Sequence, residues 1–92
     1  MNWTWSFAKN RENARKHRLS FETAQLVFDD PHALSRPDPF TGEERWQTVG
    51  RIGPVTVLVV HTWPDVDDRP GRIISARKAT THERKAYEEG DF

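Results

Sequence analysis

Two cations, Arg77 and Lys78, stand where the last predicted strand meets the last predicted helix. At such a junction the Arg77 guanidinium is suited to bind a phosphate with two hydrogen bonds, together with the amide groups at the N-terminus of the helix. We expect Arg77 to share its strand face with Ile73 and Ser75, because strand side chains alternate between the two faces of a sheet. The structural alternative is an ion pair between Arg77 and Glu83. The sequence therefore predicts either an anion site or an ion pair at this junction.

His61 is a second candidate, because it interrupts an apolar strand near its end, in line with Val55, Val57 and Val59. A histidine titrates near neutral pH, so it is able to take a proton from a ribose hydroxyl or to give one to a leaving oxygen. The alternative is a histidine at the edge of the core that hydrogen-bonds a backbone carbonyl. If His61 acts in catalysis, it must lie within a few ångströms of a point that Arg77 also reaches.

Three further side chains fall where they could join such a site. Arg45 and Arg51 share one face of the strand predicted over residues 44–53, and antiparallel neighbours could bring them towards Arg77. Tyr87 lies on the inner face of the last helix, either as a core residue or with its hydroxyl reaching a site at the sheet edge. Single arginines carry little information, whereas three arginines on adjoining strands favour the binding of a polyanion.

Other kinds of chemistry find no support in the residues. The segment "HERKA", residues 82–86, resembles the start of a zinc-protease helix, but Ala86 occupies the position of the second histidine ligand. The chain has no cysteine, no glycine-rich phosphate loop and no nucleophile elbow. We therefore predict neither a metal site nor a cofactor, and the lack of cysteine is typical of a reducing, cytoplasmic setting.

Length and charge bound the class of protein. The chain has 92 residues, which predicts a single domain over residues 1–92 with one small core. No apolar run approaches the ~18 residues that span a membrane, and the first residues lack the apolar centre of a signal peptide, so we expect a soluble protein. The formal net charge is zero, but residues 9–18 and 69–85 are strongly basic while the middle of the chain is acidic. If the two basic segments meet, they form a surface suited to polyanions; otherwise they are solvated helix faces.

The elements that must position these residues follow from capping and periodicity. Ser6 and Ser20 are suitable N-caps for two helices, and the second helix ends at the next proline. Thr80 and Glu83 match a capping box, which begins a last helix that ends near Gly90. Strand patterns cover residues 32–38, 44–53, 54–63 and 72–77. This order predicts an α+β domain in which the two N-terminal helices pack on a four-stranded, mainly antiparallel sheet, followed by a C-terminal helix.

The segments "NRENARKHRLSFETAQLVFDDP", "ERWQTVGR", "VLVVHT" and "RIISARKATTHERKAYEEG" follow one another in this order over most of the chain. Together they resemble the BrnT toxins of bacterial type II toxin–antitoxin systems. The resemblance implies a compact RelE-like fold and ribonuclease activity that arrests translation. It also implies inhibition by a BrnA-like antitoxin with a ribbon-helix-helix DNA-binding part, within a toxin–antitoxin hetero-oligomer.

The chain departs from that family at two places. Arg18 stands where a glycine is usual, so we expect either a left-handed backbone at Arg18, at some cost, or a different helix end. The loop "WPDVDDRPG" is usually shorter, which affects the length of the hairpin and access of a substrate.

The resemblance also implies roles for the candidate residues in RNA cleavage by the ribose 2′ hydroxyl. Arg77 and Arg51 would stabilise the phosphate in the transition state, and His61 would be an acid or a base. Glu83 would be either a second proton carrier or the capping residue that fixes Arg77. Binding of the RNA is assigned to Lys16, Arg45, Arg72, Lys78 and Tyr87. No metal is required, and the alternative function is a module that binds RNA or a protein without cutting it.

Overall fold

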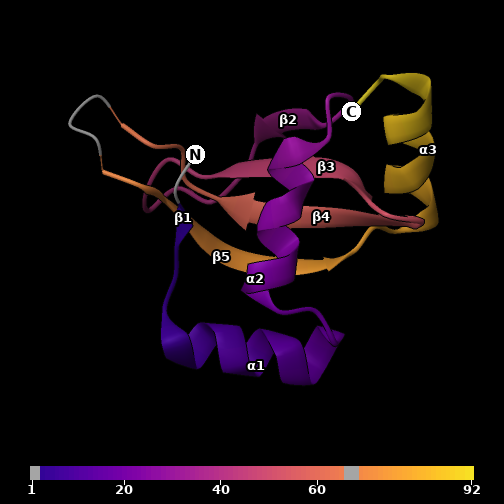
Figure 1. Cartoon of the computed structure of the whole chain (residues 1–92). Helices are drawn as coiled ribbons and strands as arrows, with labels where there is room; N and C mark the ends of the chain where they lie inside the picture. Colours follow the sequence, from indigo (N-terminus) through magenta and orange to yellow (C-terminus); the bar gives the residue numbers. More distant parts are fainter. Residues whose placement is uncertain (1–2, 66–68) are drawn as a thin grey trace.

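The computed structural model describes residues 3–65 and 69–92 (Figure 1). Residues 1–2 lie outside the described residues, as do residues 66–68 of the segment 63–71 that we expect to affect the length of the hairpin and access of a substrate. The elements are β1 Trp3–Thr4, α1 Phe7–His17, α2 Phe21–Ala24, the 3₁₀-helix η1 Gln25–Asp29, β2 Leu34–Pro37, β3 Trp46–Ile52, β4 Val55–His61, β5 Gly71–Lys78 and α3 Thr81–Glu89. The predicted helices and strands are all present, and the second helix continues from α2 into η1.

The sheet has five strands in the order β1-β5-β4-β3-β2, so the prediction of four strands is wrong. The additional strand is β1, which pairs in parallel with β5 through Trp3 with Gly71 and Thr4 with Arg72, while the other pairs are antiparallel. Gly71 makes this approach possible, because a Cβ there would lie 2.2 Å from the Trp3 ring. A strand of two residues is too short to show an alternating pattern, which is why the sequence does not indicate it.

Residues paired across neighbouring strands point to the same side of the sheet, so the register shows which side chains share each face. On the helix face, Phe21 and Val27 of α2 and η1 pack on Val57 and Val59 of β4. In Figure 1, α2 crosses in front of this face. The opposite face, called here the α3 face, carries the buried Leu58 and the residues that share its side, and α3 packs there against β3.

A β-bulge determines on which face of the sheet the side chains at the end of β5 lie. The pairing of β4 with β5 shifts between Val60 and His61, so that His61 pairs with Ile73 whereas Val60 pairs with Ser75. Ile73 therefore packs in the core on the helix face, while Ser75 and Arg77 lie on the α3 face. The expectation that Arg77 shares a face with Ile73 is wrong, because the bulge inserts one residue into the alternation.

Asn13 joins α1 to the sheet. β1 pairs only with the first two residues of β5, so the outer edge of β5 at Ala76 has no strand partner in the described residues. The Asn13 carboxamide replaces that partner: Nδ2 donates to the Ala76 carbonyl at 2.7 Å, and the Ala76 amide donates to Oδ1 at 3.1 Å. Nδ2 also donates to the Leu19 carbonyl at 2.9 Å, which connects the α1–α2 turn to the same point. Buried backbone groups are thereby satisfied without a further strand.

The end of α1 is strained. Arg18 adopts a left-handed backbone with φ 54°, and its amide donates to the Ala14 carbonyl at 2.9 Å. A side chain in this conformation costs about 1–2 kcal/mol relative to the right-handed region, and glycine escapes that cost. Of the two outcomes expected for Arg18, the structure has the left-handed one.

The predicted capping box begins α3, since the Thr80 hydroxyl accepts from the Glu83 amide and the Glu83 carboxylate accepts from the Thr80 amide. The helix ends at Gly90, as predicted, with φ 70°. Within residues 3–65 and 69–92, no helix is long and apolar enough to cross a membrane.

Candidate active site

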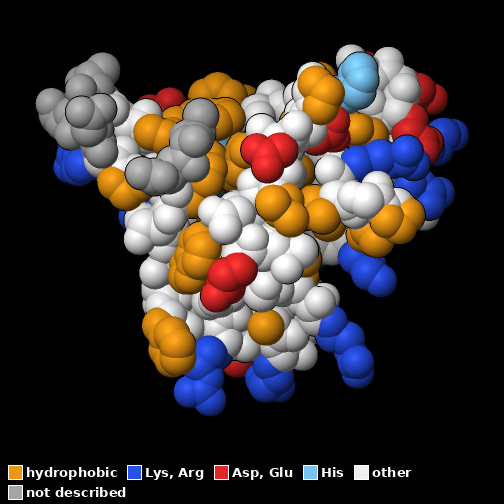
Figure 2. Space-filling view, in the orientation of Figure 1, with side chains coloured by type: hydrophobic (Ala, Val, Ile, Leu, Met, Phe, Trp, Pro, Cys, Tyr) orange, Lys and Arg blue, Asp and Glu red, His pale blue; other side chains and the backbone are white. Residues whose placement is uncertain are grey.

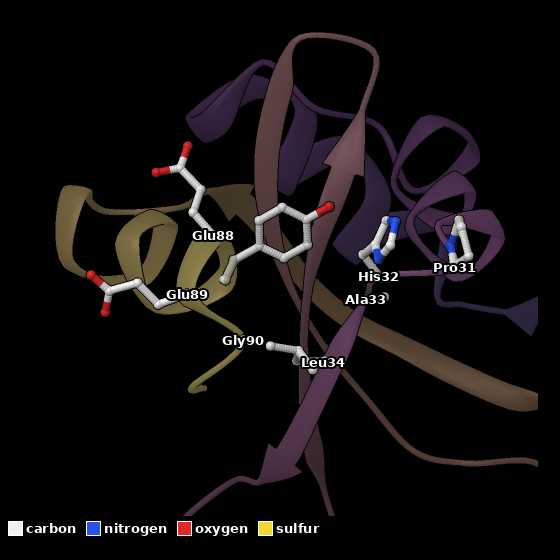
Figure 3. Close-up of a pocket in the computed structure, with 8 residues that line it drawn as sticks. Pro31, His32, Ala33, Leu34, Glu88, Glu89 and Gly90 are labelled. Atoms are coloured by element: carbon white, nitrogen blue, oxygen red, sulfur yellow. The ribbon is translucent and has the colours of Figure 1, made fainter.

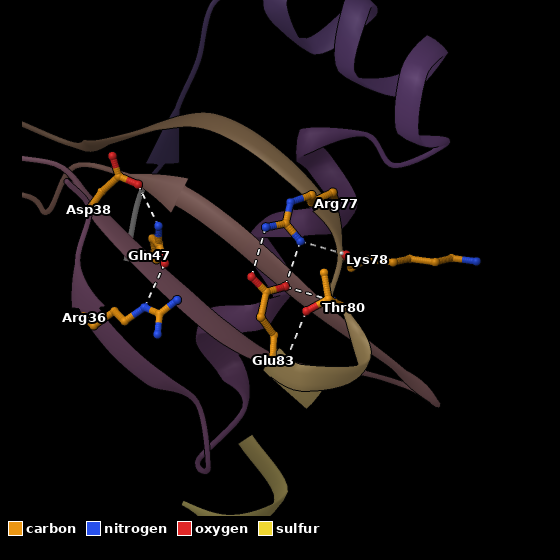
Figure 4. Close-up of polar contacts among 7 residues, drawn as sticks. All are labelled: Arg36, Asp38, Gln47, Arg77, Lys78, Thr80 and Glu83. Atoms are coloured by element: carbon orange, nitrogen blue, oxygen red, sulfur yellow. Dashed lines mark hydrogen bonds and ion pairs between the residues drawn. The ribbon is translucent and has the colours of Figure 1, made fainter. Parts of the chain in front are cut away.

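Arg77 and Glu83 form a forked ion pair at the junction between β5 and α3 (Figure 4). Arg77 Nη1 donates to Glu83 Oε1 at 2.8 Å, and Nη2 donates to Oε2 at 3.0 Å. The Arg77 Nη1 group also donates to the Lys78 carbonyl at 3.2 Å, and Glu83 Oε1 accepts from the Thr80 amide at 2.8 Å. Because the capping box holds Glu83 and Glu83 holds Arg77, the start of the helix sets the direction of the guanidinium.

The charge of Glu83 is fixed by the same contacts. The hydrogen bonds from Arg77 lower the pKa of Glu83 to about 2, while burial opposes the shift. The carboxylate is therefore ionised at neutral pH and does not serve as a proton donor. The Glu83 side chain is only 12% exposed whereas that of Arg77 is 38% exposed, so the arginine is the more accessible of the two to a ligand from solvent.

Arg77 keeps donors that point away from Glu83. A guanidinium carries five N–H groups, and Glu83 and the Lys78 carbonyl take those of Nη1 and one of Nη2. Within the described residues nothing accepts from Nε, which leaves the edge formed by Nε and the second Nη2 hydrogen available. Such an edge matches two oxygens of a phosphate.

A second polar group lies across the α3 face from this pair. Gln47 of β3 pairs with Arg36 of β2 and with Val60 of β4, which places Arg36 and Gln47 on the α3 face. Arg36 Nε donates to Gln47 Oε1 at 2.9 Å, and Gln47 Nε2 donates to Asp38 Oδ1 at 2.7 Å (Figure 4). Arg36 is not among the residues expected from the sequence. Its place in a strand directly opposite Gln47 is the signal that would have identified it, but that signal requires the register of β2 with β3.

Arg45 and Arg72 come together at the other end of this face. Both donate to the same oxygen of Glu43, Arg45 Nε at 3.0 Å and Arg72 through Nη2. The Arg45 guanidinium also lies 3.8 Å from the centre of the Phe40 ring. Arg36, Arg45, Arg72 and Arg77 thus share the α3 face, and we call this set of four the arginine face.

His61 is not part of the arginine face. It is fully buried on the helix face, with its ring between those of Trp3, Phe28 and Trp63. Nδ1 donates to the Thr62 carbonyl at 3.1 Å, so Nε2 accepts from the Thr48 hydroxyl at 2.6 Å. Burial lowers the pKa of His61 to about 4, and the ring is neutral at pH 7. The sheet itself separates His61 from Arg77, so the common point required of a catalytic pair does not exist, and the backbone-bonding alternative describes His61 here.

Arg51 and Tyr87 meet each other rather than Arg77. Both line a cavity of about 450 Å³ beside Asp30, and Arg77 does not line it. Tyr87 donates from Oη to Asp30 Oδ2 at 2.6 Å, and the same oxygen accepts from the Arg51 amide at 2.8 Å. Burial, followed by the bond to Asp30, raises the pKa of Tyr87 to about 12, so its hydroxyl keeps its proton. Tyr87 thus attaches α3 to the loop before β2.

Tyr87 also borders a groove of about 530 Å³ between α3 and the start of β2 (Figure 3). In Figure 3 the side chains of Glu88 and Glu89 point away from His32, on the other wall. The groove therefore contains no converging set of charged groups.

Lys16 and Lys78 lie away from the arginine face. Lys16 is exposed in the last turn of α1, on the helix side of the sheet. Lys78 pairs with Val57, which puts its side chain on the helix face as well, and in Figure 4 it extends away from Arg77. Of the site residues expected from the sequence, the structure brings together Arg77 with Glu83, and Arg45 with Arg72.

In the described part of the chain, no three His, Asp or Glu side chains are arranged to hold a metal ion.

The sequence matches the model of a known protein family. A family model described as the ribonuclease toxin BrnT of type II toxin–antitoxin systems matches residues 5–83, a span that includes both members of the Arg77–Glu83 pair. Among curated proteins, none matches the chain significantly. Since the family model covers most of the sequence, the chain belongs to the BrnT family of ribonuclease toxins of type II toxin–antitoxin systems.

Proposed function

We propose that this BrnT-family toxin is a metal-independent endoribonuclease in which Arg77 contacts the scissile phosphate. The observation that carries the proposal is the Arg77–Glu83 pair, which aims a guanidinium from a fixed position and leaves its Nε–Nη2 edge without an acceptor among the described residues. In the proposed reaction the ribose 2′ oxygen bonds to phosphorus while the bond to the 5′ oxygen breaks. The 2′ hydroxyl loses its proton and the leaving 5′ oxygen gains one, and the products end in a 2′,3′-cyclic phosphate and a 5′ hydroxyl.

Arg77 would act on the charge that builds up during this step. A donor held in place before the reaction stabilises the phosphorane-like state more than a mobile one, and loss of one such donor costs about 100- to 1000-fold in rate. Glu83 is a positioning residue in this proposal, because it is ionised and sheltered from solvent. His61 has no proposed catalytic role, since it is neutral and faces the other side of the sheet.

The rest of the arginine face would bind the RNA backbone. Arg36, Arg45 and Arg72 offer guanidinium groups on the same side of the sheet as Arg77. Binding through phosphates weakens steeply with salt, so affinity for RNA should fall as the salt concentration rises. Cleavage of messenger RNA would arrest translation, which places the action of the toxin in the cytoplasm.

As a toxin of a type II system, the protein has an antitoxin as its partner. We infer that the antitoxin is BrnA-like, with a ribbon-helix-helix DNA-binding part, and that toxin and antitoxin form a hetero-oligomer. We also infer that the five-stranded sheet with its covering helices is a variant of the RelE-like fold. A partner that covers the arginine face would exclude RNA from it.

The proposal is tested with antitoxin-free protein and ribosome-free RNA in EDTA. The parent protein should cut the RNA and leave 2′,3′-cyclic phosphate ends, and Arg77→Ala should cut it at least about 100-fold more slowly. Arg84→Ala is the matched control, because Arg84 is an exposed arginine of α3 with no ion pair in the described residues, and its rate should equal that of the parent.

Two outcomes would contradict the proposal. Equal cleavage by the parent and by Arg77→Ala would remove Arg77 from the reaction. Intact RNA in every tube, even after ribosomes are added, together with retained RNA binding, would favour the alternative of a module that binds without cutting.

A further inference from the structure

A cavity on the helix face is distinct from the arginine face. It has a volume of about 170 Å³ and lies where the α1–α2 turn meets the β3–β4 hairpin. Its walls are mainly the aliphatic side chains of Leu19, Ile52, Val55 and Val57. A dry cavity of about 150 Å³ lined by such side chains is able to hold a benzene molecule. The cavity therefore has room for one apolar side chain of another molecule.

Three basic residues lie around this cavity: the cations Arg18, next to the end of α1, and Lys78, at the end of β5, together with His17. All three are exposed, and no ion pair or side-chain hydrogen bond engages them within residues 3–65 and 69–92. Figure 2 views this face of the molecule and shows Lys and Arg side chains along α1 and near the hairpin end of the sheet. The cavity is therefore apolar inside, and the basic side chains at its rim make no ion pair with the described residues.

The strained backbone at Arg18 indicates that the helix does not by itself require an arginine at this position of the rim. The cations of the last turn, Arg15 and Lys16, already complement the negative end of the α1 dipole. Arg18 is the single non-glycine residue with positive φ among those described, at a position where glycine would be unstrained. Strained residues that persist are concentrated at binding sites. Lys78 reaches the same cavity from a different element, so two separate parts of the chain supply the charge.

We propose that this cavity is the docking site for an acidic segment of the antitoxin, which inserts one apolar side chain between Leu19 and Ile52. Carboxylates beside that side chain pair with the rim cations, so charge complementarity selects the partner. A nucleic acid is the weaker match, because the walls are mainly aliphatic and the described residues offer no Phe, Tyr or Trp ring there on which a base could stack. The inference depends on the antitoxin partner and not on the proposed cleavage mechanism.

The position of the cavity relative to Arg77 explains how docking of the antitoxin would inhibit the toxin. Lys78 follows Arg77 directly in the chain, but their side chains lie on opposite faces of the sheet. A segment held at Lys78 is therefore next to the β5–α3 junction, and the antitoxin chain that continues past this junction reaches the guanidinium of Arg77. Docking on one face would bring the partner to the active site on the other.

The experiment measures the affinity of the full-length cognate antitoxin for purified toxin variants by calorimetry. Lys78→Glu and Arg18→Glu should weaken binding by about tenfold or more, and added salt should reduce the affinity of the parent. Lys9→Glu is the matched charge reversal, because it lies on α1 about 13 Å along the helix axis from Arg18. Its affinity should equal that of the parent.

Arg18→Gly separates docking from folding. It removes the rim cation and relieves the positive φ, so the melting temperature should rise while the affinity for the antitoxin falls several-fold. RNA cleavage by free Arg18→Gly should stay at the parent level. A toxin that binds the antitoxin in this way but cuts no RNA would contradict the proposed ribonuclease mechanism and leave the docking site intact.

The proposal is wrong if both charge reversals bind the antitoxin as tightly as the parent does. It is also wrong if Lys78→Glu weakens binding of a single-stranded RNA oligonucleotide and leaves the antitoxin affinity unchanged, because the rim would then serve RNA.

Discussion

Replacing Glu83 by glutamine tests how the helix cap positions Arg77. The substitution keeps the shape of the side chain but removes the charge that pairs with the guanidinium. In the folded protein the pKa of Glu83 is about 2, against 4.5 for the unperturbed group. A lowered pKa means that the ionised carboxylate stabilises the folded state fully above pH 4.5, and that this contribution disappears as the pH falls towards 2.

The size of this contribution follows from the shift. A difference of about 2.5 pH units, at about 1.4 kcal/mol per unit, corresponds to about 3 kcal/mol. Because the Arg77 side chain is 38% exposed and solvent screens the pair, we expect about 2 kcal/mol. Glu83→Gln should therefore lose about 2 kcal/mol of unfolding free energy relative to the parent at pH 7, and almost nothing at pH 2.

Urea unfolding at pH 7, 4.5, 3 and 2 measures this difference, and Glu88→Gln on the exposed side of α3 is the control. RNA cleavage at pH 7 by Glu83→Gln should fall on the order of 10- to 100-fold, because Arg77 is no longer held in direction. A difference in unfolding free energy between parent and variant that stays constant from pH 7 to pH 2 would refute the ion-pair reasoning. Unchanged cleavage by a folded Glu83→Gln protein would refute the positioning role.

Three further predictions concern the scaffold. Asn13→Ala should lower the unfolding free energy by about 2–4 kcal/mol in urea, because the amide and carbonyl of Ala76 lose their partners, and a loss below about 0.5 kcal/mol would contradict that account. Arg18→Gly should raise the unfolding free energy by about 1 kcal/mol, since the positive φ is no longer strained, and thermal melting that shows a decrease would contradict the assigned strain. Burial holds the folded-state pKa of His61 at about 4 against 6.5 when unfolded, so stability should be complete above pH 6.5 and fall by about 3 kcal/mol as the pH drops to 4. That slope should vanish in His61→Gln, and a variant that keeps the full slope would show that another group titrates there.

The helices illustrate how much of this fold is local. Ser6 and Ser20 cap α1 and α2, and the Thr80–Glu83 box begins α3, as their sequence patterns predict. A cap needs only the side chain and the backbone of the next three residues, so it is visible in the sequence. Strand β1 is the opposite case, because its two residues form a strand only through pairing with Gly71, nearly seventy positions later in the chain.

The candidate site divides in the same way. Arg77 and Glu83 are close in sequence, so the sequence alone predicts both an ion pair between them and a capping role for Glu83. His61 is a candidate because it interrupts an apolar strand, and nothing in the sequence states whether it faces the same side of the sheet as Arg77. Arg36 was missed, since a lone arginine in a short edge strand has no meaning until Gln47 lies opposite to it.

What the sequence by itself determined is the family, the order of helices and strands, the caps, and the placing of Arg77 and Glu83 at the start of the last helix. These features depend on residues near one another in the chain, or on a pattern that runs along it. The tertiary structure decided which side chains share a surface. The bulge at Val60 and His61 turns Arg77 to the face opposite His61, and the edge left free on β5 gives Asn13 its function. Side chains alternate every residue along a strand, so a shift of one residue, set by long-range packing, reverses the face of every residue beyond it.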